Sequence, residues 1–407
     1  MKFSYGKIFV LGLGFLIISL TWSVYNAYVP PILDGLLSHL PYSDTLVGFI
    51  MTFDNIAAII LIPYFGALSD STWTRFGRRM PFLLISVPIA AFFFAIIPNF
   101  SSSLLYLIPI IVVMNIAMAA FRAPAIALMP DLTPSNLRSK ANGIVNLMGG
   151  FGALLFYFIF TSFFSGEQTF LAFPVVSGVM VIVLIALFLV IKEPMDQFTA
   201  AKKRPQGITQ SLLRIMKEPE GSTRFMMYAI FMWFVGWNGV ETFFTLYAMD
   251  KWGLEPAPAA FYLGFFSLSF LVMAIPSGFM ATKLGRKKIV RAGLIGMVFM
   301  LGSFYFASPI PLAIGLLILG GIFWALININ SYPMVADMAP VAQLGTFTGL
   351  YYFFSSLAAI VAPPIFGVLM DLVNTRMILF PLAALAYLVA LWLMDRVNKG
   401  EVQPEIS

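Results

Sequence analysis

Four charged residues fall inside or at the end of long apolar stretches of the chain. Asp54, Arg122 and Glu241 lie within such stretches, and Asp131 closes one. A charged side chain at the centre of a bilayer costs about 2.5–3.5 kcal/mol on insertion scales, so it normally faces a cavity or a partner. A guanidinium offers several donors to hydroxyl or carboxylate groups, and a carboxylate at low dielectric can be set to take up a proton. These residues predict solute binding and proton transfer.

Arg122 has a polar companion on the same predicted helix. Asn115 precedes it by seven residues, two helical turns, so both side chains are expected on one face. We expect this pair to contact a substrate. The alternative is structural, with Arg122 forming an ion pair with Asp54 inside the N-terminal half.

Two tryptophans repeat one spacing in predicted helices of the two halves. Trp22 precedes Asn26 by four residues, and Trp237 precedes Glu241 by four residues. Aromatic rings with a few placed polar groups beside them are the usual lining of a small-molecule site, and a ring can stack on the apolar face of a sugar. The spacing therefore predicts substrate contacts from all four side chains. Anchoring at the membrane interface is the alternative for the two rings.

The chain also contains two copies of one loop element about half a chain apart. GALSDSTWTRFGRR occupies residues 66–79, and GFMATKLGRKK occupies residues 278–288. A second echo keeps nearly the same offset, because Asp131 and Asp337 each open an Asp-x-x-Pro sequence. Repeats in a very apolar chain indicate two homologous membrane bundles, an arrangement typical of transporters with a site between the halves.

The repeat extends to the candidate binding residues. Asn328 follows Arg122 at the offset that separates the two Asp-x-x-Pro sequences, and Tyr332 comes one helical turn later. We expect Asn328 and Tyr332 to contact substrate from the second half. Packing between helices is the alternative for the aromatic ring.

The first loop copy retains an acid that the second copy has lost. We expect Asp70 and Arg78 to pair and favour one of two bundle arrangements, and Gly66 to let helices approach closely. Asp131 is expected to pair with Arg138 or with the Arg78 cluster. A surface pair is worth about 0–1 kcal/mol and a partly buried network more; the alternative is that the basic residues only set topology. The residues predicted to take part in gating are Asp70, Arg75, Arg78, Arg79, Asp131, Arg138 and Arg286.

The composition predicts that membrane helices position these residues. Of 407 residues, 60% are hydrophobic and 10% are charged, which is not the composition of a soluble domain. There is no Cys and only one His, His39, so we expect no disulfide, no metal site, no cofactor and no catalytic residue. Twelve apolar segments are long enough to span a bilayer, at 6–29, 45–68, 80–98, 104–130, 138–164, 169–191, 223–248, 259–282, 289–307, 310–336, 344–370 and 376–395.

The basic residues predict the orientation of this all-α membrane protein. Of the 24 Lys and Arg residues, all but Arg122, Lys251 and Arg376 fall in loops of one side, so both termini are expected in the cytoplasm. The longest polar stretch, at about 192–222, separates two predicted six-helix bundles. A short amphipathic helix is expected within it, at 208–217. The predicted parts are an N-terminal bundle at 1–191, a cytoplasmic linker at 192–222 and a C-terminal bundle at 223–407.

These motifs resemble those of a known family. The pattern G-x-x-S-D-x4-R-x-G-R-R at 66–79 resembles the loop between helices two and three of the major facilitator superfamily. Together with W-x5-Y-V at 22–29 and N-x6-R-A at 115–123, it is similar to the sucrose transporters within the glycoside–pentoside–hexuronide cation symporters. The resemblance covers the first half well and the second half mainly by topology. It implies the major facilitator fold, and it implies that Arg122 is the substrate-binding cation.

The chain departs from this family in the acids that couple transport to ions. Melibiose-type sodium symporters carry paired acids on helix two, where this chain has Ala58 and Ile62. Proton-coupled plant members carry an acid on helix four, eleven residues before the arginine, where this chain has Ile111. Sodium coupling is therefore not expected, and proton coupling would use Asp54 or Glu241. Uncoupled transport stays open.

These patterns predict a secondary active transporter for a disaccharide or small oligosaccharide, working by alternating access with proton symport. Drug or lipid efflux by the same fold is the second hypothesis, and it would require a wider apolar cavity. A membrane-embedded enzyme is a remote third, because the chain has no His pair, no Cys and no large polar loop. We expect a monomer in the plasma (inner) membrane, with a sugar and the lipid bilayer as partners and no nucleic acid.

Overall fold

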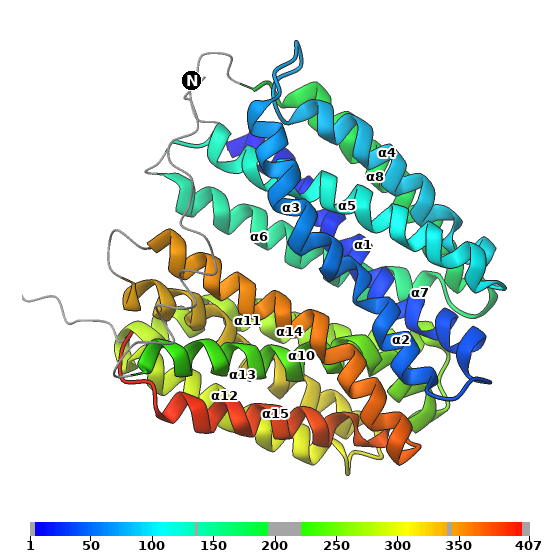
Figure 1. The fold of residues 1–407 in the computed structure, drawn as a ribbon, viewed down its shortest axis with the longest axis vertical. Helices are drawn as coiled ribbons and strands as arrows, with labels where there is room; N and C mark the ends of the chain where they lie inside the picture. The colour runs from blue at the N-terminus through cyan, green and yellow to red at the C-terminus, as the bar shows by residue number, and fades with distance from the viewer. Residues whose placement is uncertain (1–4, 135–136, 194–220, 340–343, 401–407) are drawn as a thin grey trace, which may run out of the picture. The chain divides into compact units, whose positions relative to one another are not determined.

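The computed structural model describes residues 5–134, 137–193, 221–339 and 344–400. Over these ranges the chain is helical between short connections and contains no strand. Each of the twelve apolar segments expected from the sequence is helical (Figure 1). The greater part of the linker expected at 192–222, including its amphipathic helix at 208–217, lies outside the described residues.

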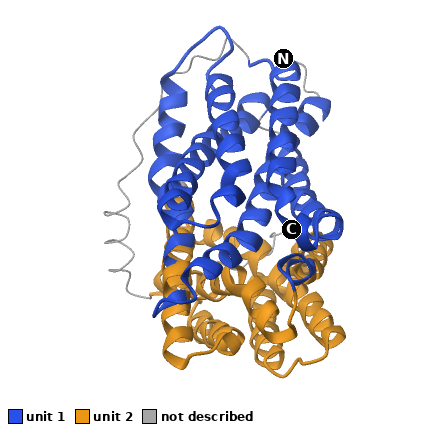
Figure 2. Ribbon diagram, turned by 90° about the vertical axis from the view of Figure 1, so that its right-hand side faces the viewer, with its two compact units in different colours: residues 1–43, 49–202, 255–261 blue, residues 44–48, 203–254, 262–407 orange. Residues whose placement is uncertain are grey.

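The chain divides into two compact units, which are coloured separately in Figure 2. Unit 1 contains residues 1–43, 49–202 and 255–261. Unit 2 contains residues 44–48, 203–254 and 262–407. The main division falls within the polar stretch at the middle of the sequence, whereas the short exchange at 44–48 has no signal in the hydrophobic pattern.

The first half of the chain forms helices that in several cases extend beyond the apolar segments. Helices α2 and α3 make one spanning segment that is interrupted at Thr52. The helices are α1 (Tyr5–Leu37), α2 (Ser43–Met51), α3 (Phe53–Ser71), α4 (Met80–Ile96) with η1 (Ile97–Phe100), α5 (Leu104–Leu132), α6 (Arg138–Leu154) with η3 (Leu155–Phe160) and α7 (Thr161–Phe163), η4 (Gly166–Leu171) and α8 (Ala172–Val190).

The second half forms the remaining spanning helices. Ten helical segments of the described chain meet the length and hydropathy expected of a membrane span. The other two expected spans, α10 and α12, are helices of 31 and 19 residues. The helices of this half are α10 (Ser222–Trp252), α11 (Pro256–Leu284), α12 (Arg286–Phe304), α13 (Ile310–Met338), α14 (Leu344–Val373), η6 (Arg376–Ile378) and α15 (Leu379–Asp395).

The two units repeat one packing pattern. In unit 1, α1 packs on α6 and α8, and α4 packs on α5 and α8. In unit 2, α10 packs on α14 and α15, and α12 packs on α13 and α15. Counting spans from the start of each half, these are the same four pairs. The structure therefore supports the duplication that the loop repeats predict.

Two glycines permit close contacts between helix backbones. A Cβ atom on Gly152 of α6 would collide with the carbonyl oxygen of Leu16 on α1. A Cβ atom on Gly321 of α13 would collide with the carbonyl oxygen of Phe266 on α11. Small residues at such crossings let membrane helices gain van der Waals contact where the hydrophobic effect between helices is absent.

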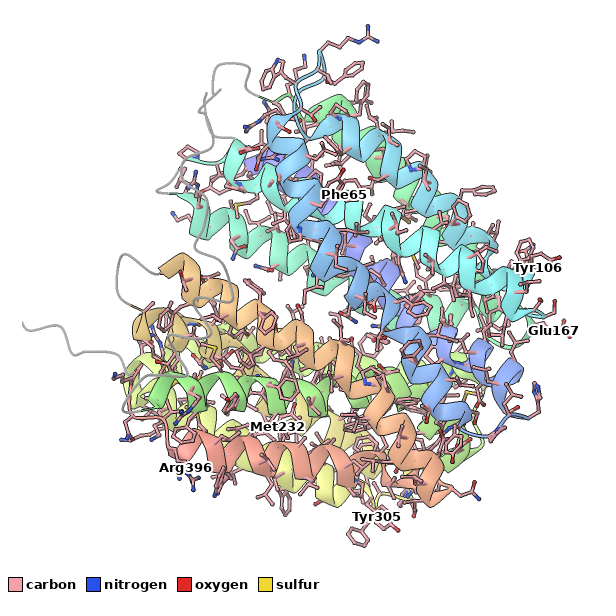
Figure 3. The ribbon with its side chains drawn as sticks, in the orientation of Figure 1. Phe65, Tyr106, Glu167, Met232, Tyr305 and Arg396 are labelled. Carbon is pink, nitrogen blue, oxygen red and sulfur yellow. The ribbon has the colours of Figure 1, made fainter. Side chains whose placement is uncertain are left out.

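Aromatic residues lie at several helix ends. Tyr106, near the start of α5, is 58% exposed, and Tyr305, just after α12, is 43% exposed. Figure 3 shows both rings directed away from their helices. Tyrosine is enriched where a membrane meets water, because its ring is apolar and its hydroxyl can reach the polar side. Both positions fit helices that cross a bilayer.

Candidate functional site

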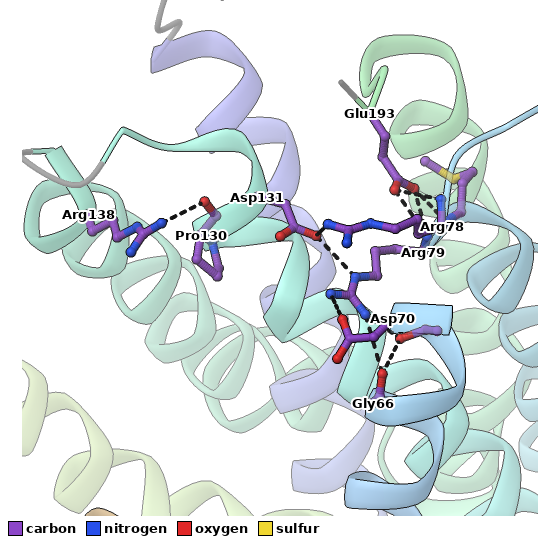
Figure 4. Close-up of polar contacts among 10 residues, drawn as sticks. Gly66, Asp70, Arg78, Arg79, Pro130, Asp131, Arg138 and Glu193 are labelled. Carbon is purple, nitrogen blue, oxygen red and sulfur yellow. Dashed lines mark hydrogen bonds and ion pairs between the residues drawn. The ribbon is translucent and has the colours of Figure 1, made fainter. Parts of the chain in front are cut away.

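A polar cluster joins the loop between α3 and α4 to the end of α5 in unit 1 (Figure 4). Its centre is Arg79, whose side chain is only 5% exposed. The Arg79 Nε donates to Asp131 Oδ2 at 3.1 Å, and one terminal nitrogen donates to Ser69 Oγ at 2.5 Å. The other terminal nitrogen pairs with Asp70. We call Ser69, Asp70, Arg78, Arg79 and Asp131 the loop cluster.

One carboxylate of the loop cluster serves two guanidinium groups. Arg78 Nη2 lies 3.1 Å from the same Asp131 oxygen that Arg79 contacts. The prediction that Asp70 pairs with Arg78 is therefore wrong, because Asp70 pairs with the next residue, Arg79. Asp131 was expected to pair either with Arg138 or with the Arg78 cluster. It pairs with the cluster, through Arg78 and Arg79. The Arg138 guanidinium instead donates to the backbone carbonyls of Thr133 at 3.4 Å and Pro130 at 3.5 Å.

Glu193 extends the cluster, and sequence reasoning missed it. Its carboxylate accepts hydrogen bonds from the backbone N–H groups of Arg78 at 2.8 Å, Arg79 at 2.9 Å and Met80 at 2.8 Å. These N–H groups lie at the start of α4, where a helix has unpaired donors and a partial positive charge. An acid directly after α8, among basic residues of the middle stretch, is the only signal that the sequence offers for this contact.

Replacing Glu193 with glutamine is expected to lower the free energy of unfolding by about 1.5–3 kcal/mol, because a hydrogen bond to a charged group is worth about that much. Glutamine keeps the size of the side chain but offers one acceptor oxygen in place of two. Thermal unfolding of the purified protein measures the change. Glu167→Gln is the matched control, because Glu167 is exposed in η4. Equal melting temperatures for the two variants would contradict the capping role of Glu193.

The second loop copy reproduces part of this geometry in unit 2. Gly77 and Gly285 each precede an arginine and have φ values of 106° and 93°, which favour glycine. Arg286, which follows Gly285, pairs with Asp337 and donates to the Pro333 carbonyl at 3.3 Å. The arginine and aspartate of this pair occupy the repeat positions of Arg78 and Asp131. The ion pair is thus retained in both halves, although the acid at Asp70 is not.

Two expectations about the first loop require correction or refinement. Gly66 does not mediate a close helix approach, since a Cβ atom there would meet nothing within 4 Å. Its carbonyl oxygen instead accepts from Ser69 at 2.9 Å and from Arg79 at 3.4 Å. Arg75 is exposed, and its guanidinium lies 4.7 Å from the centre of the neighbouring Phe76 ring.

The candidate binding residues of unit 1 lie on α1, α3 and α5. Arg122 is exposed in the middle of α5, whereas Asn115 of the same helix is only 2% exposed. Sharing a helix face therefore does not give the two side chains the same surroundings. Among the described residues, neither amide atom of Asn115 has a hydrogen bond. The buried Tyr25 hydroxyl of α1 likewise has no hydrogen bond to the described residues.

The polar groups around these residues are only partly satisfied within the described chain. Asp54 accepts a hydrogen bond from Asn55 at 2.8 Å. Trp22 packs edge-on against Tyr25 at 5.4 Å between ring centres, and its buried indole N–H has no hydrogen bond to the described residues. Asn26 is half-buried one turn further along α1. A buried polar group without a partner costs about 1–3 kcal/mol, so a hydrogen bond to the Trp22 indole or to the Asn115 amide would be stabilising.

The half-buried ring of Trp237 in unit 2 stacks with two other aromatic rings. Phe266 stacks on it with ring centres 4.7 Å apart, and Trp324 stacks on it at 5.1 Å. A sugar that stacked on Trp237 would compete with these two rings for the indole surface. Offset stacking between aromatic rings stabilises packing, so the triple stack is a structural element of unit 2.

The other candidate residues of unit 2 remain accessible to different degrees. Glu241 and Asn328 are half-buried, and Tyr332 is 36% exposed. The Tyr332 hydroxyl lies 3.1 Å from Thr348 Oγ1, and its ring packs against Tyr351 with centres 5.5 Å apart. Tyr332 is thus the most accessible aromatic ring among the predicted binding residues of this unit.

The described residues include no group of three His, Cys, Asp or Glu side chains arranged to hold a metal ion. The carboxylates of the loop cluster, Asp70 and Asp131, pair with guanidinium groups, and Glu193 accepts from helix N–H donors.

Comparisons with known proteins agree with the fold. The family model of the Major Facilitator Superfamily matches residues 11–270 and 246–406. The glucose transporter GlcP of Staphylococcus epidermidis is 23% identical, over 97% of this chain and 94% of its own. Multidrug resistance protein 2 of Bacillus subtilis is 24% identical, over 84% of each chain. A D-xylose-proton symporter structure superposes with a TM-score of 0.73 at 19% identity, over 98% of this chain and 99% of its own.

The resemblance inferred from the loop motif is thereby confirmed at the level of the superfamily. The match covers both halves of the chain, including the second half, where the sequence motifs are weaker. The spanning helices, the duplicated packing and the family match agree with one another. The chain belongs to the Major Facilitator Superfamily, and it is a multi-pass transporter of the plasma membrane.

Proposed function

We propose that this transporter carries a sugar, a disaccharide or small oligosaccharide, by proton symport. The observation that supports this most is the exposed guanidinium of Arg122 in the middle of a spanning helix, two turns from the unsatisfied amide of Asn115. Ionisable residues within spans normally face the bundle interior or a water-filled cavity, where a solute can reach them. Sugar hydroxyls both donate and accept hydrogen bonds, so they complement a guanidinium and an amide together.

The relatives support the substrate class. A glucose transporter aligns with nearly the whole chain. In unit 2, the half-buried Asn328 offers a hydrogen-bonding group at the repeat position of Arg122, and the exposed ring of Tyr332, one helical turn later, offers an aromatic face. Binding from both halves would let closure around the solute drive alternating access. In this proposal the protein acts as a monomer without a cofactor, and both termini are cytoplasmic.

Drug efflux is the second candidate function. The alignment with multidrug resistance protein 2 of Bacillus subtilis covers 84% of each of the two chains. The packed aromatic stack at Trp237 would suit an apolar solute if it opened during the cycle.

A thermal-shift screen of the purified protein separates these candidates. Mono-, di- and trisaccharides are tested in parallel with lipophilic cations, which represent the substrates of drug efflux. We expect a saturable rise in melting temperature with at least one disaccharide, because a ligand that binds only the folded state stabilises it. A rise in melting temperature with lipophilic cations, and with none of the sugars, would favour efflux and contradict the proposal.

Proton coupling is expected to depend on Asp54 or Glu241, because both are carboxylates within spanning helices. Asp54→Asn and Glu241→Gln remove the proton-binding group with little change in size. The variant that alters the coupling residue should lose pH-dependent accumulation but keep counterflow exchange, which needs no proton gradient. Uptake and exchange are measured in proteoliposomes. If neither variant separates the two activities, both carboxylates are structural and the coupling assignment is wrong.

A further inference from the structure

Basic residues gather where α10 and α12 begin and where α15 ends, all within unit 2. The expected orientation uses them only as charges, and a topological signal requires no particular arrangement of side chains. Figure 3 shows Arg396 and Tyr305 at opposite ends of this unit. We call these residues, at the end away from Tyr305, the basic cluster: Arg224, Lys287, Lys288, Arg291 and Arg396.

Arg396 is held in place by two aromatic rings. Its guanidinium carbon lies 3.4 Å from the centre of the Trp392 ring and 6.0 Å from the centre of the Phe225 ring of α10. Nη1 donates to the Trp392 carbonyl at 2.8 Å, and the other guanidinium N–H groups make no hydrogen bond to the described residues. The residue is exposed. A planar set of donors fixed by stacking suits a phosphate group, which accepts two such bonds at once.

Phe225 brings a second guanidinium to the same place. The Arg224 guanidinium carbon lies 5.6 Å from the centre of the Phe225 ring. The backbone supports this arrangement, because Ser222 Oγ accepts from the N–H groups of Asn398 and Lys399 at 2.9 and 3.1 Å. The start of α10 and the chain after α15 are thus joined. Two positive charges near one ring repel each other, so an anion beside them would be stabilising.

The acidic residue next to Arg396 does not cancel this charge. Asp395 Oδ1 lies 2.6 Å from Arg291 Nε, and the Asp395 carbonyl accepts from Lys287 Nζ at 3.2 Å. The first turn of α12 contains no acid, so Lys287 and Lys288 lie at the positive end of the helix dipole. A cation is unfavourable there, and the basic cluster therefore keeps an excess of positive charge.

The exposed faces of α12 and α15 continue from the basic cluster as apolar surface. On α15, Leu385, Leu388 and Trp392 share one helix face, and each is at least 50% exposed. Ile295 and Phe299 of α12, which packs on α15, are exposed to the same degree. In a bilayer such a face contacts lipid chains, and a Trp beside basic residues lies at the level of the headgroups.

We propose that the basic cluster binds the headgroup phosphate of an anionic phospholipid, with Arg396 as the main contact and the acyl chains along the apolar face of α15. The charge of the cluster complements the headgroup, and the apolar face complements the chains. In the proposed orientation the cluster faces the cytoplasmic leaflet, where anionic lipids attract basic residues. The bound lipid holds the start of α10 against the end of α15. This inference goes beyond sugar transport and does not depend on the solute.

Native mass spectrometry of the purified full-length protein tests the site. The protein is titrated with dioleoyl phosphatidylglycerol and, separately, with dioleoyl phosphatidylcholine, which has the same chains and no net charge. We expect Arg396→Gln to lower the affinity for phosphatidylglycerol by about tenfold or more, because a charge-assisted pair of hydrogen bonds is lost. The affinity for phosphatidylcholine should not change. Arg396→Lys should be intermediate, because it keeps the charge without the planar donors.

Lys283→Gln is the matched control for charge. Lys283 is exposed in the last turn of α11, at the same end of unit 2 but outside the basic cluster. Salt screens charges over about 8 Å, so this variant should change the affinity by less than about twofold. Trp392→Leu keeps an apolar side chain but removes the stacked support of Arg396, so it should weaken phosphatidylglycerol binding selectively. Equal losses in Lys283→Gln and Arg396→Gln, in folded proteins, would show general attraction only and overturn the site.

Two further measurements exclude other occupants. Glycerol phosphate has the phosphate without the chains, and binding as tight as that of phosphatidylglycerol would assign the cluster to a soluble anion and overturn the proposal. Glu401 and Glu405 follow the cluster in the sequence and lie outside the described residues. Lipid binding that appears only when both are changed to Gln would make the chain's own tail the occupant and also overturn it. No sugar is used, so the result is independent of the proposed substrate.

Discussion

Arg122→Ala is expected to abolish high-affinity sugar binding and to reduce uptake to background. Each hydrogen bond from a charged donor contributes about 1.5–3 kcal/mol, and a guanidinium makes more than one. We therefore expect Kd to rise by about 100-fold or more. Because the side chain is exposed, its removal should lower the melting temperature of the sugar-free protein far less than it weakens binding.

Binding and stability together distinguish the two roles considered for Arg122. Arg122→Lys keeps the charge but loses the planar set of donors, so it should bind with an intermediate affinity. If Arg122 served only to neutralise Asp54, Arg122→Ala would lower the melting temperature, and a second change, Asp54→Asn, would restore it. Wild-type affinity in Arg122→Ala would remove this residue from the binding site.

Arg79→Ala should have the largest effect on stability. The side chain is almost fully buried and joins Asp70, Ser69 and Asp131. Removing one partner of a buried ion pair costs about 3–5 kcal/mol. Asp131 and Asp70 are 20% and 55% exposed, so solvent screens part of the loss. We therefore expect a decrease in unfolding free energy of about 2–3 kcal/mol and a loss of most transport activity.

A neighbouring arginine provides the matched control for Arg79. Arg75 lies on the same loop but is exposed beside Phe76, so Arg75→Ala should change stability by less than about 0.5 kcal/mol. Arg79→Lys should fall in between, because one ammonium group cannot reach all three partners. Thermal unfolding and uptake are measured on the same preparations. Similar stabilities for Arg75→Ala and Arg79→Ala would show that the loop cluster is not a structural centre.

The helices and the duplication could be predicted because both follow from long-range patterns in the sequence. Twelve apolar segments of spanning length leave little choice of secondary structure in a membrane, where every backbone group must be paired. The repeated loops and the Asp-x-x-Pro echo anticipated the shared packing of the two units. These features do not depend on the exact direction of any side chain.

The details of the sites depend on such directions and could not be predicted. Adjacent residues on a loop point in different directions, so the sequence could not show that Arg79 and not Arg78 meets Asp70. The cap by Glu193 joins residues more than a hundred positions apart. The ring of Trp237 stacks with Phe266 and Trp324, which come from two other helices. Each outcome is decided by tertiary contacts.

Uptake by proteoliposomes tests the central claim most directly. Vesicles containing the purified protein are given an inward proton gradient and a radiolabelled disaccharide chosen from the thermal-shift screen. We predict that the disaccharide accumulates inside the vesicles above its external concentration and that a protonophore abolishes this accumulation. Vesicles that contain Arg122→Ala should not accumulate the disaccharide. Failure of every tested mono-, di- and trisaccharide to enter tight vesicles that contain folded protein would contradict the assignment as a sugar transporter.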